Sequence, residues 1–143
     1  MASAQTKADC EALLSALLPL AEQRLSEQRV LLPFGSALSS TDEVTEYESG
    51  SALPLHLAEP RIAELRERFR ELAESGAIKA SALAYSSSAA APAGAEPEHA
   101  VQILLDHRDD YSLVVTFPYH WSGSELVIDE PHAAEGAHDI FGR

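Results

Sequence analysis

Apolar residues recur at helical spacing in two segments of the chain. In residues 7–28 they fall at steps of three and four, which predicts an amphipathic helix with one wide apolar stripe. The stripe consists of Leu13, Leu14, Leu17, Leu18, Ala21 and Leu25. Pro19 lies inside this segment and predicts a kink or a division, because proline has no backbone N–H to donate within the helix. A second helix is predicted over residues 59–76, where Pro60 suits the first turn and Gly76 a stop after the last.

Between the two helices, residues 29–49, RVLLPFGSALSSTDEVTEYES, alternate as two strands and predict a β-hairpin with residues 39–42 as its turn. Pro33 and Gly35 interrupt the first strand, so this stretch is either a ligand-holding loop or an irregular strand. A phosphate-binding loop is disfavoured, because the stretch has one glycine and the chain is acidic. We therefore expect an edge or bulged strand that curls over the second helix, with Pro33 outside the ladder and Phe34 buried.

The middle of the chain changes from small strand-forming residues to an unpatterned stretch. Residues 50–58 are expected to be a connector, and residues 77–86, AIKASALAYS, predict a strand. Residues 86–98 are rich in Ala, Ser and Pro without periodicity, which predicts a flexible loop.

The last third gives the sharpest structural prediction. Residues 99–107 and 111–119 alternate around a three-residue loop and predict a hairpin that pairs Leu105 with Leu113. Its apolar face consists of the pairs Leu105–Leu113, Ile103–Val115, Val101–Phe117 and His99–Tyr119. Residues 124–130 predict a short final strand, and no element is assigned to the tail, residues 131–143, although Ile140 and Phe141 could dock against the body.

The expected order is α-β-β-α-β-β-β in one domain spanning residues 1–143. Hairpin-like connections favour an α+β fold with two helices packed on one face of a mostly antiparallel five-stranded sheet.

Composition narrows the classes of partner. The chain has 23 acidic and 10 basic residues, a net charge of −13. Such a chain repels phosphate backbones and anionic lipids, so we expect neither a nucleic acid nor a membrane as partner and favour a basic protein partner. The single cysteine, Cys10, and a start without a secretory pattern lead us to expect a cytoplasmic protein. Acidic surfaces also serve solubility, which is the alternative explanation of the charge.

Known catalytic and cofactor signatures are missing from the sequence, so we expect a protein that is not an enzyme and needs no cofactor. Histidine is the one chemically versatile residue type that is concentrated in one region, because every histidine except His56 lies in the last third of the chain. A metal site is conceivable there, since imidazole and carboxylate groups suit zinc or nickel; solvent-facing histidines are the alternative. The candidate ligands are His120, His132, His138 and Asp139.

A second group of candidates would contact a partner or ligand. Tyr119, His120 and Trp121 place aromatic rings and an imidazole at a strand end, where Pro118 predicts an edge or a bulge. Core packing is the alternative for Tyr119. Acidic candidates for a basic partner are Asp109 and Asp110.

The leucine-rich first helix, the run LLPFGSAL at 31–38 with its polar turn, and the strand VTFPY at 115–119 carry a resemblance. Together they resemble small uncharacterised bacterial α+β proteins in which a helix precedes a Pro-Phe-Gly hairpin. The resemblance implies no assigned activity and assigns no functional residue. We expect a non-enzymatic protein that acts through protein–protein contact as a homodimer, in an immunity- or inhibitor-like role with an acidic surface. The alternative is a small-molecule or metal-binding module that uses the aromatic and histidine residues at 119–138.

Overall fold

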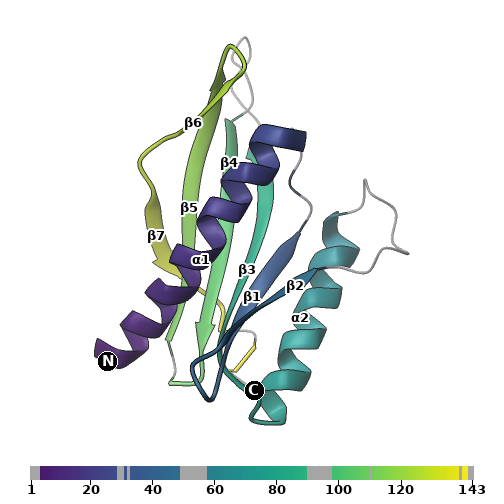
Figure 1. Cartoon of the computed structure of the whole chain (residues 1–143), viewed down its shortest axis with the longest axis vertical. Coiled ribbons are helices and arrows are strands. Elements are labelled where there is room, and N and C mark those ends of the chain that lie inside the picture. The colour runs from purple at the N-terminus through teal and green to yellow at the C-terminus, as the bar shows by residue number, and fades with distance from the viewer. Residues whose placement is uncertain are drawn as a thin grey trace.

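The computed structural model describes residues 4–28, 31, 33–48, 58–89, 98–109, 111–138 and 140–141. These residues form two helices and a seven-stranded sheet (Figure 1). The elements are α1 (Ala4–Gln28), β1 (Phe34–Ser39), β2 (Val44–Glu48), α2 (Ala58–Glu74), β3 (Ile78–Ala89), β4 (Glu98–His107), β5 (Tyr111–Ser122), β6 (Glu125–Ile128) and β7 (His132–Glu135). Neither α1 nor α2 is long and apolar enough to cross a membrane.

The strands pair antiparallel in the order β2-β1-β3-β4-β5-β6, and β7 also pairs with β5. This confirms the α+β class with a mostly antiparallel sheet, and the register is confirmed where Leu105 pairs with Leu113. The count of five strands and the order α-β-β-α-β-β-β are wrong, because the sheet has seven strands. The strand predicted at residues 124–130 is present as β6, and the tail contributes β7, which was not predicted. β6 and β7 share one edge of β5, and Pro118 lies at the break between them, where its carbonyl oxygen accepts the N–H of Asp129 at 2.7 Å.

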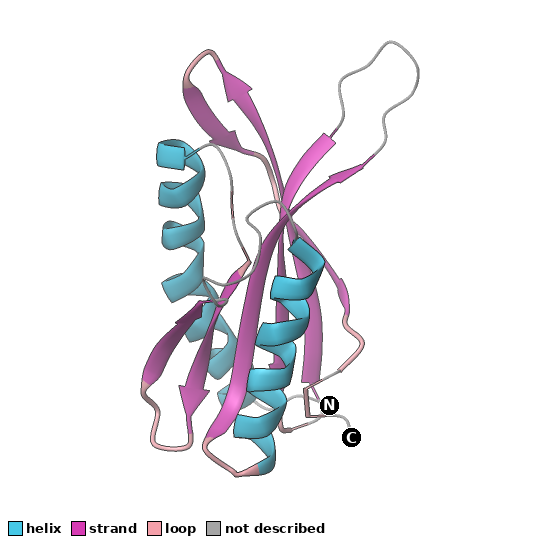
Figure 2. Ribbon diagram, turned by 90° about the vertical axis from the view of Figure 1, so that its right-hand side faces the viewer, coloured by secondary structure: helices cyan, strands magenta, loops and turns pink. Residues whose placement is uncertain are grey.

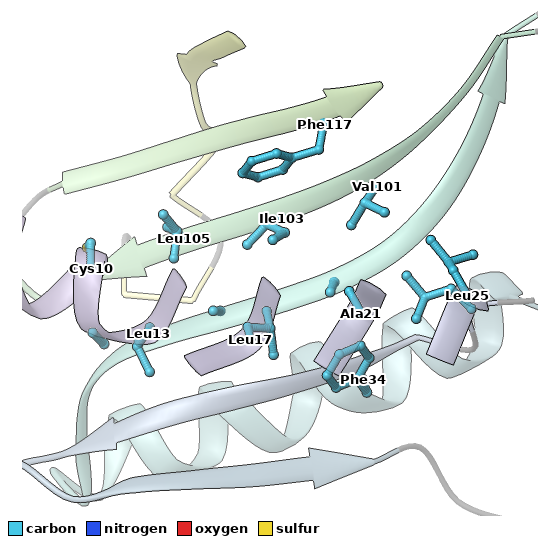
Figure 3. Packing of buried hydrophobic residues seen from close by; sticks show 14 of the residues in the cluster. Cys10, Leu13, Leu17, Ala21, Leu25, Phe34, Val101, Ile103, Leu105 and Phe117 are labelled. Carbon is cyan, nitrogen blue, oxygen red and sulfur yellow. The ribbon is translucent and has the colours of Figure 1, made fainter. Parts of the chain in front are cut away.

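The two helices do not share a face of the sheet, so that part of the prediction is also wrong. α1 packs on the face that carries Ala82 and Ile103, whereas α2 packs on the face that carries Ala37 and Leu83. Neighbouring residues of a strand point to opposite faces, so Ala82 and Leu83 of β3 serve different helices. In Figure 2 strands of the sheet run between the upper part of α1, at the left, and α2, in front. Figure 3 shows leucines of α1 in the same buried cluster as aliphatic side chains of β4; the labelled residues are Leu13, Leu17 and Leu25 of α1 and Val101, Ile103 and Leu105 of β4.

The Pro-Phe-Gly stretch has a different role from the one expected. Phe34 is fully buried against α1 and is the first paired residue of β1, so Pro33 lies outside the ladder; both predictions are confirmed. However, β1 is an interior strand between β2 and β3, and its one register shift lies at Leu38 and Ser39 rather than near Pro33. The expectation of an edge or bulged Pro-Phe-Gly strand is therefore wrong.

Several features of the elements were predicted from the sequence and can be compared with the structure. α1 continues through Pro19 as one helix, and the turn of the first hairpin is confirmed, with Asp42 at φ 67°. Gly76, at φ 77°, ends α2 as expected. The predicted loop at 86–98 is too long, because β3 extends to Ala89 and β4 begins at Glu98; residues 90–97 lie outside the described residues, as do 50–57 of the connector.

Candidate functional site

The aromatic candidates at the end of β5 do not form one surface. Tyr119 is buried on the α1 side, its ring stacks on His99 with centroids 5.8 Å apart, and its hydroxyl lies 2.9 Å from the Ser86 hydroxyl. This is the core-packing alternative considered for Tyr119. Trp121, two residues further along β5, points to the same side of the sheet as Tyr119 and is half-buried. His120 points to the opposite face and is exposed.

The structure does not bring the predicted metal ligands together. His120 lies near one end of β5, His132 is paired with Thr116, and the backbone N–H of His138 donates to the Ser112 hydroxyl at 3.1 Å. These three positions along β5 are four residues apart, about 13 Å for each step. Within the described ranges, no three His, Cys, Asp or Glu side chains are grouped as metal ligands would be.

Two of the acidic candidates, Asp110 and Asp139, lie outside the described residues. Asp109 is exposed and belongs to a network at the β4–β5 turn. Its carboxylate accepts the Thr6 hydroxyl at 3.1 Å, and its backbone N–H donates to Nδ1 of His107 at 3.0 Å. Asp109 thus joins the first turns of α1 to this hairpin.

Asp9 and His107 form the buried centre of that network. Because Nδ1 of His107 accepts a backbone N–H, Nε2 must carry the proton and donate to the Asp9 carboxylate, 2.9 Å away. Both ring nitrogens are therefore engaged, and the ring has no lone pair left to accept a substrate proton. An Asp–His pair of this kind orients elements of the fold and is not arranged as a general base.

Lys79 completes the network because the sheet is irregular at this point. Ser39 pairs with Ile78 and Leu38 pairs with Ala80, so Lys79 is an extra residue in β3. The bulge directs its side chain toward Asp9, with Nζ 3.5 Å from the carboxylate, and it also forms an ion pair with Asp42. Sequence alternation alone could not reveal this bulge.

The charges in this network shift the pKa values of its members. Burial alone would raise the pKa of Asp9, but hydrogen bonds from His107 and Gln5 and the charge of Lys79 outweigh it and hold the pKa below 3.8. The hydrogen bond to Asp42, helped by the charge of Asp9, raises the pKa of Lys79 against the opposing effect of burial. The ionised pair is therefore the stable form at neutral pH.

On the opposite face, Asp106 is a second buried carboxylate. It accepts the backbone N–H of Ile140 at 2.7 Å and of Phe141 at 3.3 Å, and it also bonds Nδ1 of His138. Burial raises the pKa of Asp106 above 3.8, although these hydrogen bonds and His138 oppose the rise. A charged residue inside the apolar run of β4 was the only sequence signal for this contact.

A cavity of about 180 Å³ lies beside Asp106. Its walls come from α2, from the sheet and from the C-terminal strap, which we define as residues 136–138 and 140–141. The strap lies against β5, where the N–H of Gly136 donates to the Ser112 carbonyl oxygen at 3.1 Å. Sequence reasoning did not find this cavity, because it depends on contacts between distant segments.

An acidic groove of about 600 Å³ lies between β2 and α2. Four glutamates and one arginine line it, and its apolar residues are Tyr47 and Leu65; the charged residues are Glu48, Glu64, Glu67, Glu71 and Arg68. The edge of the Tyr47 ring meets the Phe69 ring at 88°, with centroids 5.6 Å apart, so the groove rests on the core under α2. The helical spacing of the acids on α2 was visible in the sequence, but the facing strand was not.

No family model matches this chain, and comparison with curated proteins and with solved structures likewise gave no match.

Proposed function

We propose that the protein is a non-enzymatic binding protein that holds a basic, extended segment of a protein partner in the acidic groove. The observation that carries this proposal is the row of three glutamates, Glu64, Glu67 and Glu71, on the α2 side of a groove that runs beside an edge strand. The fourth lining glutamate, Glu48, is paired with Arg24 of α1, and Nη1 of Arg70 lies 3.8 Å from the Glu67 carboxylate. Complementary charge speeds encounter and selects among partners. An immunity- or inhibitor-like protein that masks a basic site would use a surface of this kind.

The neighbouring strand supports the extended form of the bound segment. Among the described strands, β2 pairs with β1 alone, so its outer edge can pair with an added strand. A peptide that adds to such an edge gains main-chain hydrogen bonds, and its alternate side chains then face the groove.

The same surface favours a basic protein partner over a second copy of this chain, although the sequence led us to expect a homodimer. Two β2 strands paired antiparallel would bring Glu46 and Glu48 of both copies together, and like charges across a ladder are destabilising. Val44, 43% exposed, is the only large hydrophobic side chain that is exposed among the residues the structure describes. Obligate dimer interfaces are far more apolar than that.

The alternative function, a small-molecule or metal module built from residues 119–138, gains no support from the geometry. Its residues are spread along β5 or buried in the core, and the buried titratable groups nearby are engaged with one another.

The proposal is tested with a fluorescent peptide of alternating lysine and valine and with two charge-matched variants. Glu67→Gln/Glu71→Gln removes two charges from the groove, whereas Glu11→Gln/Glu22→Gln removes two exposed charges from α1. Fluorescence anisotropy should show a loss of affinity of about fivefold or more in the groove variant and less than about twofold in the α1 variant. Equal losses would mean that the peptide responds to overall charge and would overturn the proposal.

A second probe separates strand addition from charge attraction. The same peptide, N-methylated at alternate residues, keeps its charge but cannot donate hydrogen bonds along one edge. If it binds as tightly as the parent, the segment does not add to β2, and that part of the proposal is wrong.

A further inference from the structure

The cavity beside Asp106 has a mainly apolar lining from three parts of the fold. β3, β4 and β5 contribute Leu83, Leu104 and Val114, and α2 contributes the ring of Phe69. The C-terminal strap lines another side with Gly136, Ala137, His138 and Ile140. The cavity therefore exists only in the folded chain with the strap in place.

Four backbone N–H groups of the strap donate hydrogen bonds to β4 and β5. Asp106 accepts two of its backbone N–H groups, and Ser112 accepts two more, one at its hydroxyl and one at its carbonyl. Ile140 is buried against the core under α2. The strap packs closely on β5, because a Cβ at Gly136 would lie 2.3 Å from the Ser112 hydroxyl oxygen and 3.2 Å from the Leu113 backbone nitrogen.

The charges of the lining favour an uncharged occupant. Arg66 and Asp106 carry opposite charges and offset one another, and the Asp106 carboxylate is already bonded to the strap. The Ser112 hydroxyl accepts the N–H of His138 and has a proton to donate, which suits a ligand with one acceptor group.

We propose that this cavity binds a small, uncharged, largely apolar molecule of the size of one or two fused aromatic rings. Apolar cavities of about 150 Å³ in other proteins bind benzene, so about 180 Å³ sets the upper size. The cavity shares no lining residue with the acidic groove. A negative result for ligand binding in the cavity would therefore leave the proposed function untouched, and a negative result for peptide binding would leave the cavity proposal untouched.

The test uses 5-fluoroindole as the probe and fluorine NMR as the readout. Wild-type protein should shift or broaden the probe resonance in a saturable way and should melt at a higher temperature with the probe present, since a ligand bound to the native state stabilises it. Val114→Phe fills the cavity and should abolish both effects, whereas Thr45→Phe adds the same ring on exposed β2 and should leave them unchanged.

Three outcomes would overturn the proposal: no saturable response in the wild type, an undiminished response in Val114→Phe, or equal losses in both variants. Should Val114→Phe fail to fold, Leu104→Met, a volume-conserving change in the cavity wall, replaces it. Unlabelled aromatic molecules of increasing size then compete with 5-fluoroindole for the site. A site in the cavity then discriminates between indole and a three-ring molecule, and binding without a size limit would contradict it.

Discussion

Gly35 of β1 and Phe69 of α2 are in such close contact that a side chain at position 35 has no space. A Cβ there would lie 2.7 Å from Cζ of Phe69 and 2.5 Å from the Ala82 carbonyl oxygen. The Pro-Phe-Gly stretch therefore serves both faces of the sheet, because Phe34 fills the core under α1 while Gly35 lets α2 approach. The glycine marks close packing between a strand and a helix, and the stretch is not a loop around a ligand.

Gly35→Ala should lower the free energy of unfolding by about 1–3 kcal/mol, the usual cost of overpacking a filled core. Urea denaturation followed by circular dichroism measures this difference. Phe69→Leu in the same chain should recover part of the loss, because the shorter side chain leaves room beside Gly35, while the contact with Ala82 remains. A neutral Gly35→Ala variant would show that the helix shifts without cost, contrary to this account.

Local pattern was sufficient for both helices, for every strand except β7 and for one register. The strict alternation of β4 and β5 around a three-residue loop fixed which residues pair, since only one register keeps the apolar residues on one face. What the pattern could not supply was the side of the sheet on which each helix packs. In β3 the alanines point at α1, whereas Leu83 points at α2. Because alanine is small and only weakly apolar, the α1 face of β3 was hard to recognise in the sequence as a second buried face.

The parts of the candidate site that were missed depend on distant contacts. β7, His132–Glu135, has the sequence HAAE and is exposed throughout, so neither alternation nor burial marked it as a strand. The bulge at Lys79 arises from a shift against β1, which a single strand's sequence does not encode. The Asp106 contact required knowing where the chain's last residues return.

Lys79→Met should destabilise the fold by about 2–4 kcal/mol, because it removes the cation beside the buried Asp9 carboxylate. The loss stays within this range since His107 and Gln5 still donate to Asp9. Asp9→Leu/Lys79→Met should be more stable than the sum of the single losses predicts, by about 1 kcal/mol or more. A double-mutant cycle by chemical denaturation measures this coupling, and strict additivity would mean that the two groups do not interact.

Asp9 and Asp106 should respond oppositely to pH. The lowered pKa of Asp9 stabilises the fold above pH 3.8, and this contribution is lost as the pH falls through the lower folded value. The raised pKa of Asp106 has the reverse sign: the folded state holds the proton more tightly, so stability falls as the pH rises from 3.8 through the folded pKa and is constant above it.

Asp106→Asn should therefore flatten the decline in unfolding free energy above pH 3.8, and Asp9→Asn should flatten the rise below it. Denaturation series from pH 3 to pH 7 on the wild type and both variants measure these slopes. The comparison uses the slope of unfolding free energy against pH. The absolute unfolding free energy of Asp106→Asn also reflects the loss of a carboxylate acceptor for the strap. Parallel curves for the wild type and Asp106→Asn above pH 3.8 would contradict the raised pKa.

Cys10 should react only when the chain unfolds. The residue is 3% exposed, and burial, with the charges of Asp9, Asp106 and Glu11, raises the pKa of its thiol to about 12. Because the thiolate is the reactive form, labelling by a disulfide reagent at pH 8 should be slower in the native protein than in urea by a factor of about 10³ or more. The labelling rate as a function of urea should follow the unfolding transition. Rapid native labelling, with Cys10→Ser as the blank, would show that α1 opens locally and that its first turns are not fixed by the network at Asp9.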